Sequence, residues 1–99
     1  MKTSDLSGSA LDWAVARCEV GEAAEQAGDW WKPSTDWAQG GPIIERERIE
    51  TFIRDEEWYS YSSLSLPMDF HGDTPLIAAM RCYVASKLGD EVEIPEELV

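Results

Sequence analysis

Few side chains in this sequence have the types and spacing that catalysis requires. The only histidine is His71, and its neighbours Asp69 and Asp73 could form a weak cation site with it. We favour a solvated loop histidine, because a histidine-centred base or metal site could come only from this one loop. The motifs of a nucleophile elbow, a zinc protease, a dithiol pair and a phosphate-binding P-loop are missing from the sequence.

The carboxylates are abundant, but they do not form a clear acid–base pair. Glu45 and Glu47 are the best-spaced candidates, and Arg46 and Arg48 alternate with them. Two residues apart on a helix, such side chains do not face each other, whereas on a strand they would share a face. The alternation of charge favours a solvated surface. We therefore expect no catalytic residue, no metal ligand and no cofactor, in a protein that is not an enzyme.

A segment rich in tryptophan and glycine is the strongest candidate for a binding site. Gly40, Gly41 and Pro42 precede an expected helix start, where free backbone N–H groups can bind an anion. Flat indole faces nearby could hold a nucleotide-like ligand by stacking. The net negative charge of the chain opposes an anionic ligand. The candidate ligand-binding or partner-binding residues are Trp30, Trp37, Gln39, Gly40 and Gly41.

The chain is strongly acidic, with 20 acidic residues, 8 basic residues and a formal net charge of −12. Direct nucleic-acid binding requires clustered Lys and Arg, and here the basic residues are scattered. An acidic surface instead attracts basic protein surfaces, including those of proteins that bind nucleic acid. Acidity that serves only solubility is the alternative interpretation.

The remaining composition indicates a globular, cytosolic protein. No apolar run approaches the roughly 18 residues of a membrane span, and the N-terminus lacks the apolar region of a signal peptide. We expect Cys18 and Cys82 to be reduced thiols in the core. Most of the five tryptophans are expected in the core as well, and a solvent-facing subset that binds a partner is the alternative.

Two helices are predicted from local signals. The clearer one covers 75–88, where Thr74 is a good N-cap, Pro75 occupies the first helical position and Gly89 follows the last periodic residue. The other covers 9–19, with an apolar stripe that ends at Cys18 and an edge closed by Trp13.

The start of the first helix has two interpretations. Ser9 and Asp12 resemble a capping box. Alternatively, Ser7 is the N-cap, and Leu6 packs on Leu11 as a hydrophobic staple.

Between the helices the pattern predicts a small antiparallel sheet. Residues 49–54 alternate with period two, 55–57 form a polar turn, and 58–64 have strand character. Residues 43–48 are expected to form a short helix after Pro42, or else the start of a strand. We expect a loop over 67–73.

The chain is therefore predicted to be an α+β protein, with N- and C-terminal helices and a short central helix packed on a β-hairpin or small sheet. A single domain is expected over 1–99, with 90–99 as an acidic C-terminal extension. Within that extension Val92 and Ile94 alternate with acids, which favours a short edge strand ended by Pro95.

Three long segments, in the same order, resemble the NinX family of lambdoid phages and prophages: 11–16, 34–47 and 74–92. More distantly, the chain resembles the phage α-β-α sandwich domain. It departs from the family pattern in 20–32 and 54–73. The resemblance implies an accessory phage protein in the host cytoplasm, and it carries no activity or catalytic residue that could be transferred.

Two functions remain open at this level. One is a protein that binds and modulates a host protein, with a possible role against host defence. The alternative is a binder that sequesters a nucleotide-like signal in a Trp/Gly-Gly pocket. Neither involves direct nucleic-acid binding or a membrane, and the sequence does not indicate an oligomeric state.

Overall fold

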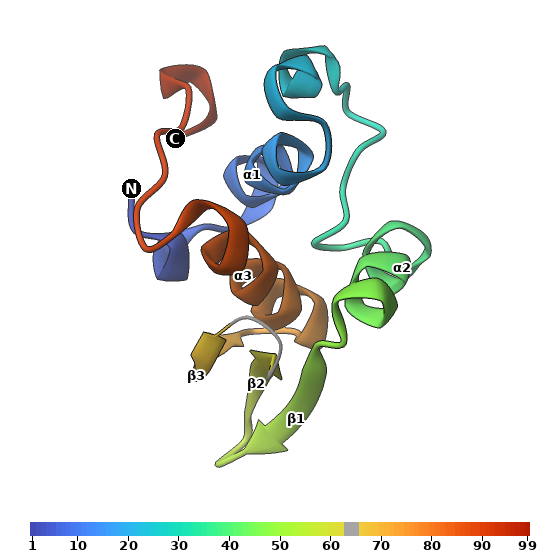
Figure 1. Cartoon of the computed structure of the whole chain (residues 1–99), viewed down its shortest axis with the longest axis vertical. Coiled ribbons are helices and arrows are strands. Elements are labelled where there is room, and N and C mark those ends of the chain that lie inside the picture. The colour runs from blue at the N-terminus through green and yellow to red at the C-terminus, as the bar shows by residue number, and fades with distance from the viewer. Residues whose placement is uncertain (63–65) are drawn as a thin grey trace.

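Helix α3, Pro75–Leu88, is the central element of the computed structural model, which describes residues 1–62 and 66–99. It lies between the sheet on one side and helices α1 and α2 on the other (Figure 1). The Thr74 hydroxyl accepts a hydrogen bond from the Ile77 N–H at 3.1 Å, and Gly89 ends the helix with a φ of 86°. This helix was predicted correctly. Because both sides are covered, eight of its residues are buried.

The sheet has three antiparallel strands in the order β1-β2-β3: Glu50–Arg54, Glu57–Ser62 and Leu66–Gly72. The predicted hairpin of the first two strands is confirmed, and its turn places Asp55 and Glu56 at positive φ. The predicted second strand also included 63 and 64, which lie outside the described residues.

Strand β3 corrects the loop that was expected over 67–73. Its residues pair in register with β2, Tyr59 with His71 and Ser60 with Phe70. The Ser60 hydroxyl donates to the Ala78 carbonyl at 2.5 Å, which ties the sheet to the first turns of α3. A Cβ at Gly72 would lie 2.7 Å from the Ala78 nitrogen, so this close approach of strand and helix requires glycine.

Helix α1, Gly8–Val20, confirms the predicted first helix. Ser7 occupies the N-cap position without a side-chain capping bond, and Leu6 and Leu11 are both fully buried in the core. The alternative capping box is wrong, because the Asp12 carboxylate accepts a hydrogen bond from the distant Ser34 N–H at 2.9 Å. A short 3₁₀ helix, η2, Gly21–Gln26, continues from α1.

Helix α2, Trp37–Glu47, begins earlier than the expected start after Pro42. The N-cap is Asp36, whose carboxylate accepts the Ala38 N–H at 2.9 Å. The Gly-Gly-Pro segment therefore lies inside the helix. A Cβ at Gly40 would lie 2.5 Å from the Pro33 carbonyl oxygen and 2.6 Å from a Leu76 methyl group, so glycine is needed where α2 meets the loop and α3.

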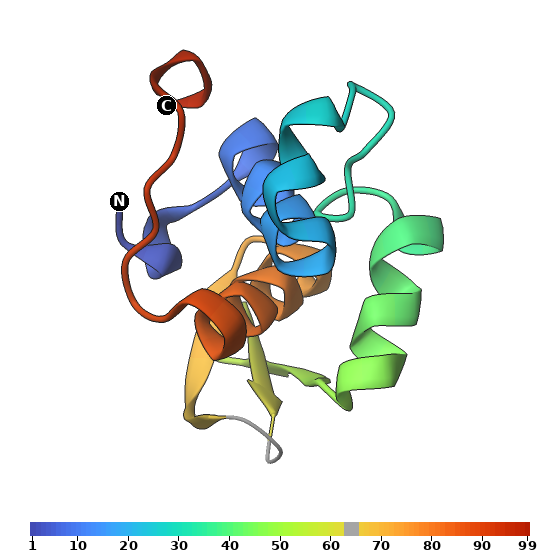
Figure 2. The ribbon, with the colours of Figure 1, turned by 45° about the horizontal axis from the view of Figure 1, so that its top comes forward.

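The two ends of the chain run side by side (Figure 2). Short 3₁₀ helices lie near each end, η1 at Thr3–Asp5 and η3 at Glu96–Leu98. The Val92 N–H donates to the Met1 carbonyl at 2.9 Å, and the Thr3 N–H donates to the Asp90 carbonyl at 2.8 Å. The expected edge strand is therefore wrong: residues 92–94 form no strand, and an isolated bridge between Lys2 and Glu91 joins the two ends.

The core contains no fully buried tryptophan, contrary to the expectation that most of the indoles would be internal. Trp13, Trp31 and Trp58 are half-buried, whereas Trp30 and Trp37 are 65% and 54% exposed. Alanines from α1 and α3 fill much of the core, and such close helix packing leaves no room for an indole. Trp13 packs against the edge of the core, as expected.

Both cysteines carry free thiols. Cys82 is buried in the core, as predicted, while Cys18 is only half-buried. Within the described part of the chain, no helix combines the length and the hydropathy needed to cross a bilayer.

Candidate partner-binding surface

The loop between η2 and α2 holds two adjacent tryptophans in fixed positions. The Trp31 indole N–H donates to the Asp12 carbonyl at 3.0 Å, which attaches this loop to α1. The Gln39 side chain accepts the Lys32 N–H at 2.6 Å and donates to the Trp30 carbonyl at 2.7 Å. The backbone that carries Trp30 is thus anchored from both sides, while its indole extends into solvent.

An apolar groove runs beside these tryptophans. Its volume is about 250 Å³, and its walls come from α1, η2 and the loop. The Trp30 groove, as we name it, is lined mainly by Ala16, Val20, Ala23, Ala27, Trp30 and Trp31. Val20 is 56% exposed, and the Trp30 ring meets the Trp31 ring edge to face with centroids 5.8 Å apart. Large apolar side chains are therefore exposed together at one place.

A second, more polar cavity of about 390 Å³ also borders Trp31. The Asp12 cavity, as we name it, is lined by Asp12, Trp13, Asp29, Trp31, Lys32 and Leu98, together with small and polar residues. Asp12 is only 9% exposed. Burial raises the pKa of its carboxyl, and the hydrogen bonds from Ser34 and the charge of Lys32 act in the opposite direction.

The five residues selected from the sequence do not form one pocket. Trp30 lines the groove, but Trp37, Gly40 and Gly41 line neither the groove nor the Asp12 cavity. The Gly40 N–H is not free for an anion, because it donates to the Asp36 carbonyl at 2.9 Å within α2. Gln39 supports the loop and has both ends of its amide occupied. The Trp/Gly-Gly residues are therefore not gathered in the groove or in the Asp12 cavity.

The sequence interpretation did not include Asp12 and Val20 among the binding residues. Asp12 was assigned to a cap, and its burial depends on Ser34, 22 positions away. Val20 ends a helix, and its exposure depends on where η2 turns. Of the residues selected from the sequence, Trp30 is the one that lines the groove.

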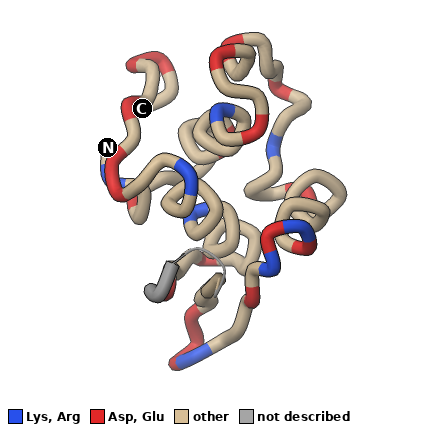
Figure 3. The backbone as a smooth tube through the Cα atoms, viewed as in Figure 1, with Lys and Arg blue, Asp and Glu red and all other residues tan. Residues whose placement is uncertain are grey.

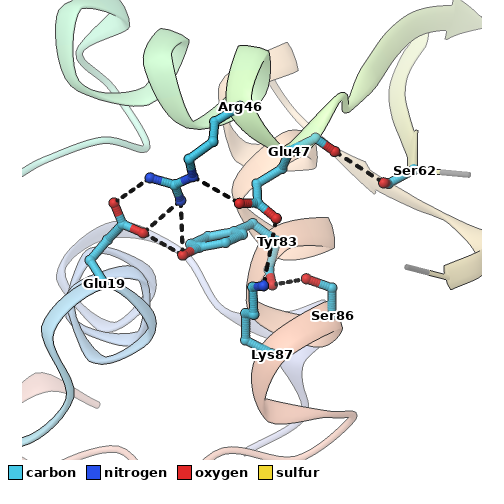
Figure 4. Close-up of polar contacts among 7 residues, drawn as sticks. All are labelled: Glu19, Arg46, Glu47, Ser62, Tyr83, Ser86 and Lys87. Atoms are coloured by element: carbon cyan, nitrogen blue, oxygen red, sulfur yellow. Dashed lines mark hydrogen bonds and ion pairs between the residues drawn. The ribbon is translucent and has the colours of Figure 1, made fainter. Parts of the chain in front are cut away.

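A network of charged residues joins the three helices beside the groove (Figure 4). Arg46 of α2 donates to both carboxylate oxygens of Glu19 at 3.1 and 2.7 Å, to Glu47 at 2.8 Å and to the Tyr83 hydroxyl at 3.1 Å. Tyr83 also donates to Glu19, and Lys87 pairs with Glu47 at 3.7 Å. The hydrogen bonds from Arg46 hold the pKa of Glu19 below its ordinary value.

This network bonds helix to helix and contains no reactive group. Glu47 is occupied by Arg46 and Lys87, and Glu45 is exposed, so the two do not form an acid–base pair. Burial raises the pKa of the neighbouring Cys18 thiol to about 12, and the charges of Glu19 and Glu47 add to that effect. Such a thiol is a poor nucleophile at neutral pH.

The residues around the single histidine do not converge on a cation. His71 lies exposed in β3, with its ring 6.0 Å from that of Tyr59. Asp69 is paired with Arg54 at 3.1 Å, and the Arg54 guanidinium lies 4.3 Å from the Tyr59 ring centroid. Among residues 1–62 and 66–99, no three His, Cys, Asp or Glu side chains are grouped to bind a metal.

Exposed acidic residues lie on the segments that form the apolar groove. Figure 3 shows acidic positions on η2 and on the loop that follows it, and others towards the C-terminus. Glu19 lines the groove and is paired with Arg46, while Glu22, Glu25 and Asp29 are exposed residues of η2 and the loop after it. This surface thus combines exposed indole and aliphatic groups with a negatively charged border.

These features define an acidic α+β domain with a rigid, tryptophan-bearing surface. The model of the family described as Bacteriophage P22, NinX matches residues 2–87, and the chain belongs to this family. A search of curated proteins found no match. The family assignment confirms the resemblance seen in the sequence and indicates a phage accessory protein.

Proposed function

We propose that this protein is a non-enzymatic phage accessory protein that binds and modulates a host protein in the bacterial cytoplasm, and that the Trp30 groove is its contact surface. The observation that carries the proposal is the exposure of Trp30 and Val20 beside an almost wholly apolar groove. Tryptophan is enriched among the few residues that supply most of the binding energy at protein interfaces. A role against host defence fits the phage family.

The groove is ordered before any partner arrives, which favours tight binding. Gln39 and the Trp31 indole fix the loop backbone, and the Trp31 ring restricts the Trp30 ring. Association then costs less conformational entropy than it would with a mobile loop.

The negative charge near the groove supports a partner with a basic surface. Glu22, Glu25 and Asp29 place negative charge beside the apolar surface, and the whole chain carries −12. Such a surface attracts a partner with a basic rim around an apolar patch. Binding, not catalysis, is the activity that these side chains support.

The proposal is tested by capturing proteins from a host lysate with the immobilised chain and with matched variants of it. Trp30→Ser and Val20→Ser should each lose a protein that the unmodified chain retains, because both truncate the apolar surface. Ile53→Ser is the control, since Ile53 is 60% exposed but lies on β1, outside the groove. For the purified partner, we expect Trp30→Ala to weaken affinity by about 2 kcal/mol or more.

Two results would contradict the proposal. One is a captured protein that the groove variants and the Ile53 variant retain equally. The other is turnover of a substrate by the purified chain that a single side-chain change abolishes.

A further inference from the structure

The Asp12 carboxylate is buried and has no ion-pair partner among the described residues. Its exposed fraction is 9%, and its hydrogen-bond donor is the neutral backbone N–H of Ser34. Buried carboxylates are rare unless they are paired. A cation supplied from outside would complete this site.

The walls of the Asp12 cavity suit a flat cation. Trp13 and Trp31 both line it, and the bond from the Trp31 N–H to the Asp12 carbonyl fixes one of the two indoles. Indole rings attract cations, and a guanidinium also stacks on them through its planar surface. The same group can donate two hydrogen bonds to one carboxylate, which an ammonium ion does with less geometric specificity.

The charges at the cavity exclude an anion. Asp12 and Asp29 line it against a single basic residue, Lys32. The volume of about 390 Å³ accommodates a guanidinium and part of its aliphatic stem. A phosphate or a carboxylate would meet the buried carboxylate and the negative field of the whole chain.

The cavity and the groove are neighbours that one partner can occupy together. Trp31 and Ala27 line both of them, so a single indole forms part of each wall. An apolar side chain in the groove and a nearby basic side chain in the cavity would therefore belong to one contact surface.

From this arrangement we infer that the Asp12 cavity binds the guanidinium group of an arginine side chain of the partner, with Asp12 as the ion-pairing residue and Trp13 and Trp31 as stacking surfaces. The inference rests on the proposed function, because it names the chemistry of the partner at the same surface. The raised pKa of Asp12 agrees with it, because the charge of a bound cation would favour the ionised carboxylate and so offset the effect of burial.

Titration with an arginine analogue tests the inference without an identified partner. N-acetyl-arginine amide should shift the indole N–H resonances of Trp13 and Trp31 saturably in NMR spectra of the whole chain. The citrulline analogue has the same shape without the charge and should bind at least tenfold more weakly. Asp12→Asn should also lower the affinity for the arginine analogue at least tenfold. Asp55→Asn changes an exposed turn residue outside the cavity and should leave it unchanged.

Equal binding of the citrulline analogue, or full binding by a folded Asp12→Asn chain, would overturn the inference. If Asp12→Asn does not fold, Trp13→Phe and the citrulline comparison on the unmodified chain decide the question. The two proposals fail separately. If Trp30→Ser loses the partner but the chain does not bind the arginine analogue, only the inferred arginine site is wrong. If the chain binds the arginine analogue but no captured partner depends on the groove, the proposed function is wrong and the cavity remains a site for a cationic ligand.

Discussion

At the scale of single residues, Arg46 and Glu19 show how surface charge is used to hold helices together. Their ion pair has two hydrogen bonds, and the Glu19 side chain is only 22% exposed, so solvent screens the pair less than a fully exposed one. Tyr83 and Glu47 complete the arrangement from α3 and α2. The charged residues of this acidic chain are therefore structural at this position.

We expect Glu19→Gln to lower the free energy of unfolding at neutral pH by about 1–2 kcal/mol, since it removes a charged acceptor of Arg46 and Tyr83. The pKa of Glu19 is lowered in the folded state, so its contribution is present above its ordinary pKa and is lost as pH falls through the lowered value. The free energies of unfolding of Glu19→Gln and of the unmodified chain, measured by denaturation at pH values from neutral to acidic, should converge as the pH falls. Glu25→Gln, on the exposed surface of η2, is the control.

The contribution of Asp12 to stability should depend on pH in the opposite direction to that of Glu19. Burial raises the pKa of its carboxyl, so the stability linked to its protonation is present below the ordinary pKa and is lost as pH rises through the raised value. Asp12→Asn keeps an acceptor for the Ser34 N–H and removes the buried charge. We expect this variant to be at least as stable as the unmodified chain at neutral pH, with the difference shrinking in acid. A clear loss of stability at neutral pH would contradict this view of Asp12.

At the scale of elements, α2 shows how one missing Cβ determines packing. Gly40 touches Pro33 and Leu76, whereas the nearest atom to a Cβ at Gly41 would be 3.9 Å away, in the Trp37 ring. The same substitution should therefore have opposite effects at two adjacent positions of one helix.

We expect Gly40→Ala to destabilise the chain by about 1–3 kcal/mol, because α2 must move away from Pro33 and Leu76. Gly41→Ala should be neutral or stabilise it by up to about 1 kcal/mol, because alanine favours the helix. Thermal or chemical denaturation of the two variants gives the comparison directly. Equal decreases in the free energy of unfolding for both variants would contradict the close contact of Gly40 with Pro33 and Leu76.

Local signals explain which elements could be predicted. The last helix could be predicted because the residues that start and end it are local in the sequence: the N-cap Thr74, the first residue Pro75 and the final Gly89. The start of α2 was missed because two glycines and a proline usually interrupt a helix, while the need for Gly40 comes from Leu76, distant in the sequence. Strand β3 was missed because its buried Phe70 lies between the exposed residues Asp69 and His71, in a segment that also contains Pro67 and Gly72.

The candidate site was predictable only in part for the same reason. Trp30 could be selected from the sequence as a candidate binding residue by its type, whereas its exposure beside the groove follows only from the tertiary structure. The Asp12 cavity combines α1, the loop before α2 and Leu98 near the C-terminus. No spacing pattern in a single segment contains that combination, and only the tertiary structure brings these residues together.

At the scale of the whole molecule, the net charge of −12 affects stability and binding in opposite directions. Repulsion among like charges disfavours the compact state, and attraction to a basic partner favours association. Added salt screens both effects, since the Debye length falls from about 10 Å at 0.1 M to about 3 Å at 1 M.

We therefore expect salt to raise the thermal stability of the chain while it weakens partner binding. Between about 0.05 and 0.5 M salt, the melting temperature should increase, and the association rate with the groove-dependent partner should fall at least tenfold. Calorimetry and binding kinetics on the same sample separate the two effects. An uncharged osmolyte such as sucrose is the control, because it stabilises the fold without screening charge. Association that does not change with salt would contradict a basic partner and leave the apolar groove as the whole of the contact.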